Sequence, residues 1–361
     1  MSSFHVPVVD ISAWVGEGAA HERARVSAEI DRACREVGFF SITGHRIADS
    51  VWSGLGEAID SFFAMPMQSK RSWTRPAPEN RGYTAPKSES LALSAGVQSE
   101  ARMKDFFEAF NVGTASSDYP GEPLVNGRYA GHYAENIWPD VDGFRDKVDA
   151  WRTEAGRVAR TLTRIFADAL GLAPDFFDHL TRHPIEVLRM NNYALPEGTR
   201  IELDEDLIGM GEHTDFGIVT VLWADQVRGL QVLDSEGTWH DVQPADDALL
   251  VNLGDLTTRL TNEQWLSTLH RVKPPILIDS TGVATIARRR SAALFHDGDA
   301  DAVIGPLPGF VTSNAPAIYA PVTVDHHVRA KLGGSRAGVL NTAAEREASR
   351  LGAHAESAGA R

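Results

Sequence analysis

Three residues of the chain have the types and the spacing of a metal site. His213 and Asp215 are separated by Thr214, and His270 follows much further along, within an apolar segment. Side chains two positions apart in an extended strand point to the same face, so His213 and Asp215 can bind one ion while Thr214 points away. His270 suits the third ligand position. Two imidazoles and one carboxylate leave three positions of an octahedral ion open, which is the arrangement of non-haem Fe(II) oxygenases.

A second pair of residues predicts an anion site. Arg289 and Ser291 share one face of a strand expected over Ile286–Phe295, and Arg290 faces the other way. A guanidinium offers a planar pair of donors that a carboxylate accepts, and a buried cation needs an anionic partner. No acidic residue is adjacent in sequence, which leaves a ligand as the candidate partner.

Several further segments accompany these residues, and together with them the chain resembles the 2-oxoglutarate- and Fe(II)-dependent oxygenases of the isopenicillin N synthase-like group. The resemblance extends over nearly the whole chain. The segments that carry it are Val6–Asp10, Gly38–His45, Phe62–Pro66, Arg81–Tyr83, Asn136–Pro139, His213–Gly217, Gly229–Val232, Val251–Asp255 and Ser267–Val272.

The resemblance implies a set of roles for the candidate residues. His213, Asp215 and His270 would bind Fe(II), and Arg289 and Ser291 would hold the C5 carboxylate of the co-substrate 2-oxoglutarate. Tyr193 would hydrogen-bond the same carboxylate, and Asn191 would lie near the metal. With O2 the enzyme would release succinate and CO2 while oxidising a C–H bond of a small-molecule metabolite, by hydroxylation, desaturation or cyclisation.

The pattern of apolar residues predicts an α+β protein. Apolar residues at helical spacing indicate helices over 21–37 and 144–169, and the Pro-, Gly- and Ser-rich residues 74–128 indicate loops that could cover a site. Short β-rich segments follow from about residue 185, as in a sandwich or jelly roll. We expect a mainly helical N-terminal region (1–184), a double-stranded β-helix (jelly-roll) core (185–315) and a C-terminal helix or tail (316–361).

The composition of the chain restricts the kinds of molecule that it is expected to bind. The chain has 361 residues, a formal net charge of −14 and one cysteine, Cys34. The negative charge opposes binding to nucleic acid and to anionic membranes. No run approaches the roughly 18 apolar residues of a membrane span. We therefore expect a cytoplasmic protein with a small-molecule substrate, and a monomer by default because no heptad pattern is present.

Other residues have both a functional and a structural interpretation. Arg189 could pair with a carboxylate of the substrate or stabilise the edge of a sheet. For His45 we expect a hydrogen-bonded core position, for Asp255 a turn, and for His326 and His327 a solvated face. Five residues could line the substrate pocket or pack in the core: Tyr83, Phe107, Phe110, Met210 and Phe295.

Three alternative functions remain at this stage. An oxidase of the same group would use Fe(II) and O2 without 2-oxoglutarate, and Arg289 and Ser291 would then hold the substrate carboxylate or a small anion. A Zn(II) hydrolase would also need a general acid or base such as the Glu of a His-Glu-x-x-His motif, which is absent. A non-catalytic binding protein would have little use for both a complete triad and a complete anion site.

Overall fold

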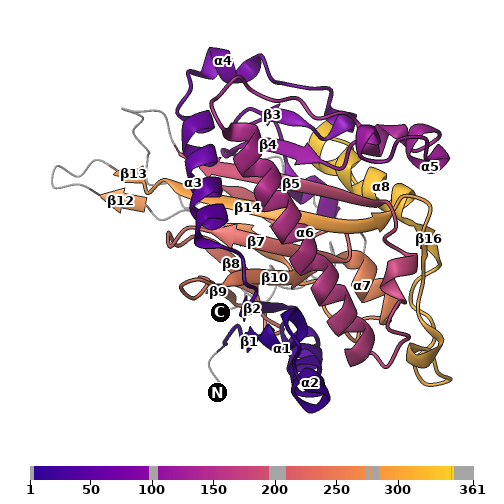
Figure 1. The fold of residues 1–361 in the computed structure, drawn as a ribbon. Coiled ribbons are helices and arrows are strands. Elements are labelled where there is room, and N and C mark those ends of the chain that lie inside the picture. The colour runs from indigo at the N-terminus through magenta and orange to yellow at the C-terminus, as the bar shows by residue number, and fades with distance from the viewer. Residues whose placement is uncertain are drawn as a thin grey trace, which may run out of the picture.

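The protein is built on two β-sheets, with the long helix α6 (Phe144–Ala169) and helix α3 (Asp49–Phe63) along one side (Figure 1). The computed structural model describes residues 4–96, 105–194, 209–273, 276–278, 284–342 and 344. The larger sheet has the strand order β1 (Val8–Asp10), β2 (Phe39–Thr43), β10 (Leu249–Leu253), β7 (Val219–Ala224), β14 (Arg289–Asp299), β5 (Pro184–Tyr193), β4 (Glu108–Gly113) and β3 (Gly82–Thr84). The smaller sheet has the order β6 (Met210–His213), β11 (His270–Val272), β8 (Leu230–Leu233) and β9 (Trp239–Asp241).

The remaining elements are shorter or lie outside these sheets. Two strand pairs stand apart, β12 (Ile276–Ile278) with β13 (Ala284–Ile286), and β15 (Val303–Ile304) with β16 (Val322–Thr323). The α-helices are α1 (Ser12–Val15), α2 (Ala20–Glu36), α3 (Asp49–Phe63), α4 (Met67–Arg71), α5 (Pro123–Asn126), α6 (Phe144–Ala169), α7 (Asp255–Leu260) and α8 (Val324–Ala337). Single 3-10 turns are η1 (Ala77–Glu79), η2 (Leu91–Ala95), η3 (Ser116–Asp118), η4 (Ala130–Tyr133), η5 (Phe177–His179) and η6 (Pro308–Phe310).

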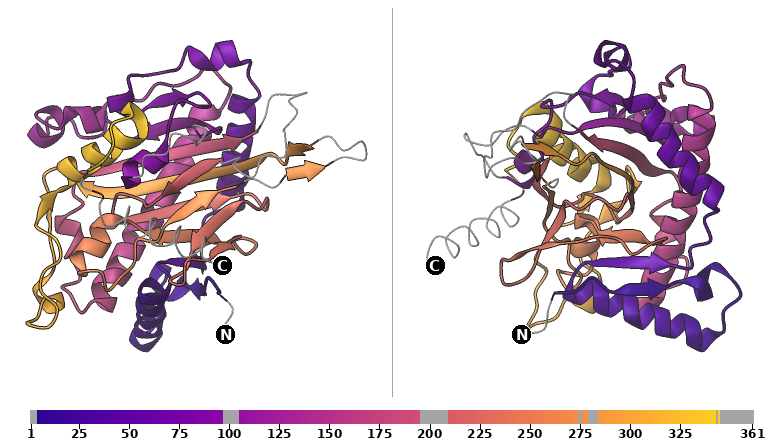
Figure 2. Two further views of the ribbon diagram at one scale, coloured as in Figure 1. Left: turned by 180° about the vertical axis from the view of Figure 1, so that it is seen from behind. Right: turned by 90° about the vertical axis from the view of Figure 1, so that its left-hand side faces the viewer.

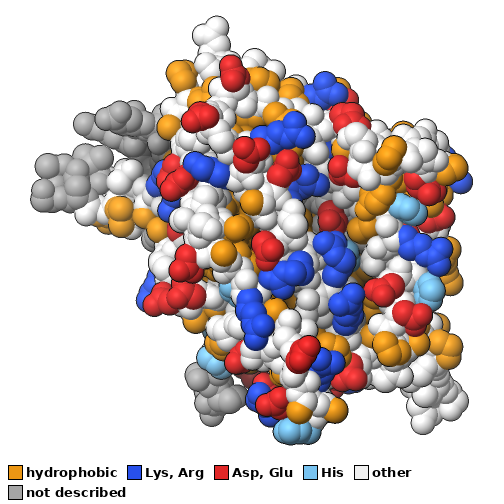
Figure 3. Space-filling model, viewed as in Figure 1, with side chains coloured by type: hydrophobic (Ala, Val, Ile, Leu, Met, Phe, Trp, Pro, Cys, Tyr) orange, Lys and Arg blue, Asp and Glu red, His pale blue; other side chains and the backbone are white. Residues whose placement is uncertain are grey.

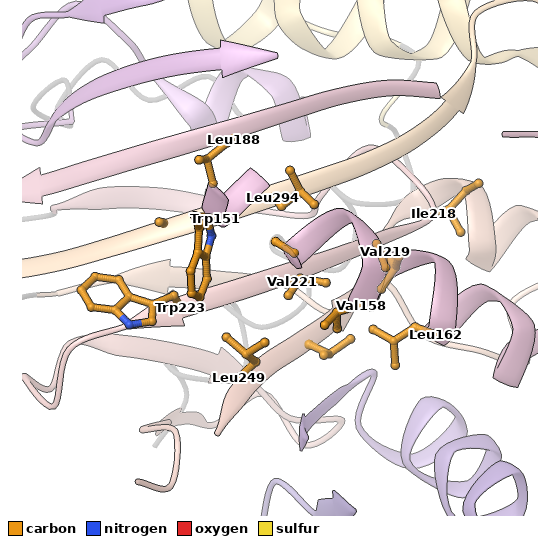
Figure 4. Packing of buried hydrophobic residues seen from close by; sticks show 14 of the residues in the cluster. Trp151, Val158, Leu162, Leu188, Ile218, Val219, Val221, Trp223, Leu249 and Leu294 are labelled. Carbon is orange, nitrogen blue, oxygen red and sulfur yellow. The ribbon is translucent and has the colours of Figure 1, made fainter. Parts of the chain in front are cut away.

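Helix α6 covers the outer face of the larger sheet because both surfaces are apolar. Its residues Trp151, Val158 and Leu162 are fully buried, and they pack toward alternate residues of the central strands, such as Val221 and Leu294 (Figure 4). Since strand side chains alternate between faces, this leaves the intervening residues on the opposite, inner face. The packing on α6 therefore determines which residues of β7 and β14 face the interior between the sheets.

The other helices divide between the two sides of the molecule. Helices α2 and α3 pack with α6, whereas α8 contacts η2 and β14. Figure 2 shows α2, α3 and α6 together along one side and the yellow α8 apart from them. On the face formed by α3 and α6, basic and acidic side chains are interspersed (Figure 3), as in the exposed ion pair between Lys147 Nζ and Glu57 Oε2 at 2.8 Å.

The structure confirms the α+β jelly-roll class and the two long helices, α2 and α6. One expectation is wrong: residues 74–128 include β3 and β4, and β4 pairs with β5 inside the larger sheet. The predicted strand over Ile286–Phe295 is divided between β13 and β14, with β14 beginning at Arg289. The N-terminal part supplies β1 to β4 to the same sheet as the core, and the division of domains at residue 184 stays a prediction.

Replacing a core residue of α6 should destabilise the whole fold. Leu162→Ala removes a fully buried side chain, and we expect a loss of about 2–5 kcal/mol in the free energy of unfolding. Arg164→Ala, two positions away on the exposed side of the helix, should change it by less than about 0.5 kcal/mol. Urea midpoints measured in parallel compare the two, and equal midpoints would contradict the role given to α6.

Candidate active site

The three predicted metal ligands come together at one end of the smaller sheet. His213 is the last residue of β6 and pairs directly across strands with His270, the first residue of β11. This register sets the two imidazole rings side by side, with their centroids 4.2 Å apart. Asp215 follows just beyond the end of β6, and its Oδ1 lies 3.8 Å from His213 Nε2 and 3.6 Å from His270 Nε2. All three side chains are buried and form a group that could hold one metal ion.

Hydrogen bonds orient each of these side chains toward the shared position. His213 Nδ1 lies 2.7 Å from the Gly211 carbonyl oxygen, and His270 Nδ1 lies 3.0 Å from that of Thr268. Carbonyl oxygens only accept, so both Nδ1 atoms donate, and the Nε2 atoms are left facing the shared position as the metal-binding atoms.

The carboxylate of Asp215 is also oriented by hydrogen bonds, here from side-chain donors. Its Oδ2 accepts from Thr220 Oγ1 at 2.5 Å and from Asn252 Nδ2 at 2.6 Å, which leaves Oδ1 for an ion. Thr220 and Asn252 lie on β7 and β10, so the larger sheet also helps to position the ligand. Burial, reinforced by the neighbouring His270, lowers the pKa of His213, which keeps its imidazole neutral and able to bind a metal.

The predicted anion site lies on the inner face of the larger sheet. Arg289 pairs across strands with Tyr193, and Ser291 pairs with Asn191. Arg289 is 2% exposed, and neither its Nε nor its Nη1 has a hydrogen-bond partner among the described residues. Its guanidinium lies 5.3 Å from the centroid of the Tyr193 ring, and Ser291 Oγ is 3.5 Å from Asn191 Nδ2. A buried cation with two unused donors is a receptor for an anion.

Arg290 behaves as the alternation predicts. It points to the other side of the sheet, where Nη1 lies 2.7 Å from Asp60 Oδ2 and Nε lies 3.3 Å from Asp225 Oδ2. Arg290 therefore has acidic partners within the described part of the protein, whereas two donor atoms of the neighbouring Arg289 have no hydrogen-bond partner there.

Both sites open into one cavity. Its lining includes the metal cluster, Asn191, Tyr193, Arg289 and Ser291. Of the five predicted pocket residues, Met210 and Phe295 line the cavity. Tyr83, Phe107 and Phe110 do not: they are buried in the hydrophobic core, and the Tyr83 hydroxyl donates to Glu108 Oε2 at 2.6 Å.

Arg189 lines the cavity but does not lie at a sheet edge, because β5 runs between β14 and β4. Its Nη2 lies 2.7 Å from Glu89 Oε2, and Arg336 Nη2 lies 3.2 Å from Glu89 Oε1. Burial alone would raise the pKa of Glu89, but the two guanidinium groups lower it, so the carboxylate stays ionised. Of Arg189, Glu89 and Arg336, only Arg189 was identified as a candidate from the sequence.

Comparisons with known proteins agree with this geometry. Residues 185–297 match the 2OG-Fe(II) oxygenase superfamily, and residues 6–141 match the family described as non-haem dioxygenase in morphine synthesis N-terminal. The chain is 32% identical to clavatol oxidase of Penicillium crustosum over 346 residues, covering 93% of this chain and 98% of that protein. It is 33% identical over 331 residues to a 2-oxoglutarate-Fe(II) type oxidoreductase of Emericella nidulans, covering 90% and 88%.

The chain belongs to the 2-oxoglutarate–Fe(II) oxygenase superfamily.

Solved structures agree on the fold of this oxygenase. A full-length Neurospora crassa protein in complex with alpha-KG superposes with a TM-score of 0.76 at 24% identity, covering 92% of this chain and 97% of that one.

Family membership sets aside the zinc hydrolase and scaffold alternatives and favours use of 2-oxoglutarate over the oxidase alternative. Enzymes of the family use Fe(II), 2-oxoglutarate and O2. In the part of the chain that the structure describes, no helix combines the length and apolar character needed to cross a membrane.

Two expectations about the oxygenase are wrong, and both concern one buried cluster behind the metal site. Asp255 begins α7 instead of forming a turn, and its Oδ2 lies 2.7 Å from Lys331 Nζ and 3.4 Å from His327 Nε2. His327 is therefore buried, although the adjacent His326 is exposed as expected. His45 is in the core with both ring nitrogens hydrogen-bonded, which confirms its structural role.

This cluster, formed by Asp255, His327 and Lys331, connects the C-terminal helix to the metal-binding segment. The backbone N–H of Asp255 donates to the Asp215 carbonyl at 2.9 Å. Lys331 Nζ donates to Thr214 Oγ1 at 3.1 Å, so the residue between two candidate ligands is fixed from α8. Sequence reasoning missed these contacts, because the only local signal was the spacing of His327 and Lys331 on one helix face.

A further cavity residue also escaped the sequence analysis. Asp297 lies on β14 on the same inner face as Arg289 and Ser291, and it is 6% exposed. Burial and the nearby Asp215 and Glu186 raise the pKa of Asp297 to about 8. The alternation that predicted the anion site would have identified this residue had it been continued to the end of the strand.

The buried ion pair of Lys331 should matter more for stability than an exposed one. Lys331→Met leaves the Asp255 carboxylate buried without its strongest partner, and we expect a loss of about 3–5 kcal/mol in the free energy of unfolding. Lys147→Met breaks the exposed pair with Glu57 and should cost about 0–1 kcal/mol. Thermal and urea unfolding of both variants make the comparison, and similar losses would refute the importance of the cluster.

Proposed function

We propose that His213, Asp215 and His270 hold Fe(II), and that Arg289 and Ser291 receive the C5 carboxylate of 2-oxoglutarate. The observation that carries this proposal is the unsatisfied guanidinium of Arg289, buried in the same cavity as the three candidate ligands. Tyr193 and Asn191 stand opposite Arg289 and Ser291 on β5, and we assign them to the walls of the co-substrate site.

The donor atoms suit these ligands. Two neutral Nε2 atoms and one carboxylate oxygen form the 2-His-1-carboxylate set of non-haem Fe(II). The co-substrate has a 2-oxo acid group at one end for the metal and a carboxylate at the other end for Arg289. Its binding would satisfy the two unused guanidinium donors and neutralise a buried charge.

The remaining residues of this region orient the co-substrate and exclude water. Leu222, Leu230 and Val272 line the cavity from both sheets, so the polar groups act in apolar surroundings, where electrostatic interactions are strong. When bound, Fe(II) with 2-oxoglutarate and O2 supplies the oxidative decarboxylation that yields succinate and CO2 and the oxidation of a C–H bond.

We assign the substrate to the part of the cavity beyond the metal, along the inner face of β14 and β5. Ile185, Val187 and Phe295 line this part, together with Val328 and Leu332 from α8. A chamber whose accessible surface is mostly apolar suits a small molecule. The monomeric state, the cytoplasmic location and the lack of nucleic-acid partners stay predictions from the sequence.

Replacing Arg289 should weaken co-substrate binding without loss of the metal. For Arg289→Ala we expect the affinity for 2-oxoglutarate to fall by about 2–3 kcal/mol, roughly 30- to 150-fold, because a charge-assisted contact to the carboxylate is lost. Arg290→Ala on the same strand is the matched control, because Arg290 faces Asp60 and Asp225 outside the cavity. Anaerobic calorimetric titration of the iron-loaded variants measures the effect. Equal affinities in Arg289→Ala and wild type would remove Arg289 from the site.

Removing the carboxylate ligand should abolish stable metal binding. Asp215→Ala leaves two neutral imidazoles, and we expect the Fe(II) content after dialysis to fall to a small fraction of the wild-type value. Asp234→Ala is the control, because Asp234 also pairs with a histidine, His240, but lies outside the cavity. Metal analysis that finds full occupancy in Asp215→Ala would contradict the assignment.

A further inference from the structure

Asp297 occupies the end of the inner row of β14 that is farthest from the anion site. The inward-facing residues of this strand run from Arg289 and Ser291 through Ala293 and Phe295 to Asp297, and all of them line the cavity. Asp297 is not one of the three residues whose ligand atoms cluster at the metal position. It is therefore a separate polar group in the part of the cavity assigned to the substrate.

Asp297 lines the cavity, and its carboxyl packs beside the backbone of Gly217. Gly217 provides the space for it, because a Cβ at that position would lie 1.9 Å from Asp297 Oδ1. The adjacent Phe216 and the strand neighbour Phe295 also line the cavity, and Phe295 pairs across strands with Val187. Apolar and aromatic residues thus share this part of the cavity lining with Asp297.

No protein group within the described ranges satisfies this carboxyl. It forms no hydrogen bond or ion pair there, in contrast to the buried acids Glu89 and Asp255, each of which has a cationic partner. Burial raises the pKa of this carboxyl, and the acidic Asp215 and Glu186 raise it further. A buried acid without a partner is costly, and the cost falls when a ligand supplies the missing donor.

The chemistry of the missing partner follows from these neighbours. A buried carboxyl without a partner favours its neutral form, and a cationic donor is the partner that most stabilises the ionised form, as the guanidinium groups do for Glu89. The aromatic lining residues Phe216 and Phe295 are compatible with a cation, because a ring face attracts positive charge.

We propose that Asp297 binds a protonated amine of the primary substrate, so that the oxygenase acts on a small molecule with a basic nitrogen. This inference rests on the proposed function, because it takes the chamber beyond the metal as the substrate site. Asp297 is then a specificity-determining residue: it fixes one end of the substrate while Ile185, Val187 and Phe295 contact its apolar part.

A matched pair of probes tests the proposal. Cyclohexylmethylamine and cyclohexylmethanol have nearly the same shape and differ in charge, and each is titrated anaerobically into the protein loaded with Fe(II) and 2-oxoglutarate. We expect the wild type to bind the amine at least tenfold more tightly than the alcohol. Asp297→Asn should abolish this preference and leave the affinity for 2-oxoglutarate within twofold of wild type.

Two further variants control the experiment. Asp301→Asn removes an acid of the same chain segment that is exposed, and it should keep the preference for the amine. Asp297→Ser is the second test variant if Asp297→Asn fails to bind 2-oxoglutarate. Equal binding of amine and alcohol by the wild type, binding of neither probe, or an undiminished preference in the Asp297 variant that binds 2-oxoglutarate would overturn the proposal. Failure of the wild type to bind 2-oxoglutarate would instead count against the proposed function.

Discussion

Uncompensated charge inside one apolar cavity is the constraint on which the site depends. Arg289 is buried with unused donors, and Asp215 has one carboxylate oxygen held by Thr220 and Asn252 and the other directed at two neutral imidazoles. Other buried charges in the described chain, such as Lys331 and Glu89, have partners from the protein. The cavity charges are balanced when a metal ion and a dicarboxylate occupy it, which is the ligand set of the oxygenase family.

Rigid elements hold these charges in position. The direct pairing of His213 with His270 sets the two imidazoles, and the packing of the larger sheet on α6 determines which residues of β14 face inward. Helix α8 contributes on the opposite side, where Lys331 connects Thr214 with Asp255. Each candidate ligand is thereby fixed by contacts from a different part of the chain, as a site with well-defined geometry requires.

The candidate site could be predicted from the sequence because it follows local rules. Alternation along a strand placed Arg289 and Ser291 on one face and Arg290 on the other, and the spacing of His213 and Asp215 indicated a shared ion. The same rule could not separate pocket from core at Phe110, because both faces of β4 are buried. Contacts that depend on tertiary packing were out of reach: the partners of Asp255 come from α8, and no local pattern pairs them. Strand β4 forms because it pairs with β5, although residues such as Gly113 favour strands only weakly.

The central claim is that the metal and 2-oxoglutarate bind in contact with each other in this cavity. Anaerobic titration of the iron-loaded protein with 2-oxoglutarate, followed by visible absorption, tests it most directly, because a 2-oxo acid chelated to Fe(II) has a weak charge-transfer band. The account predicts a band that saturates at one equivalent of co-substrate per iron. Binding of both iron and 2-oxoglutarate without the band would contradict it.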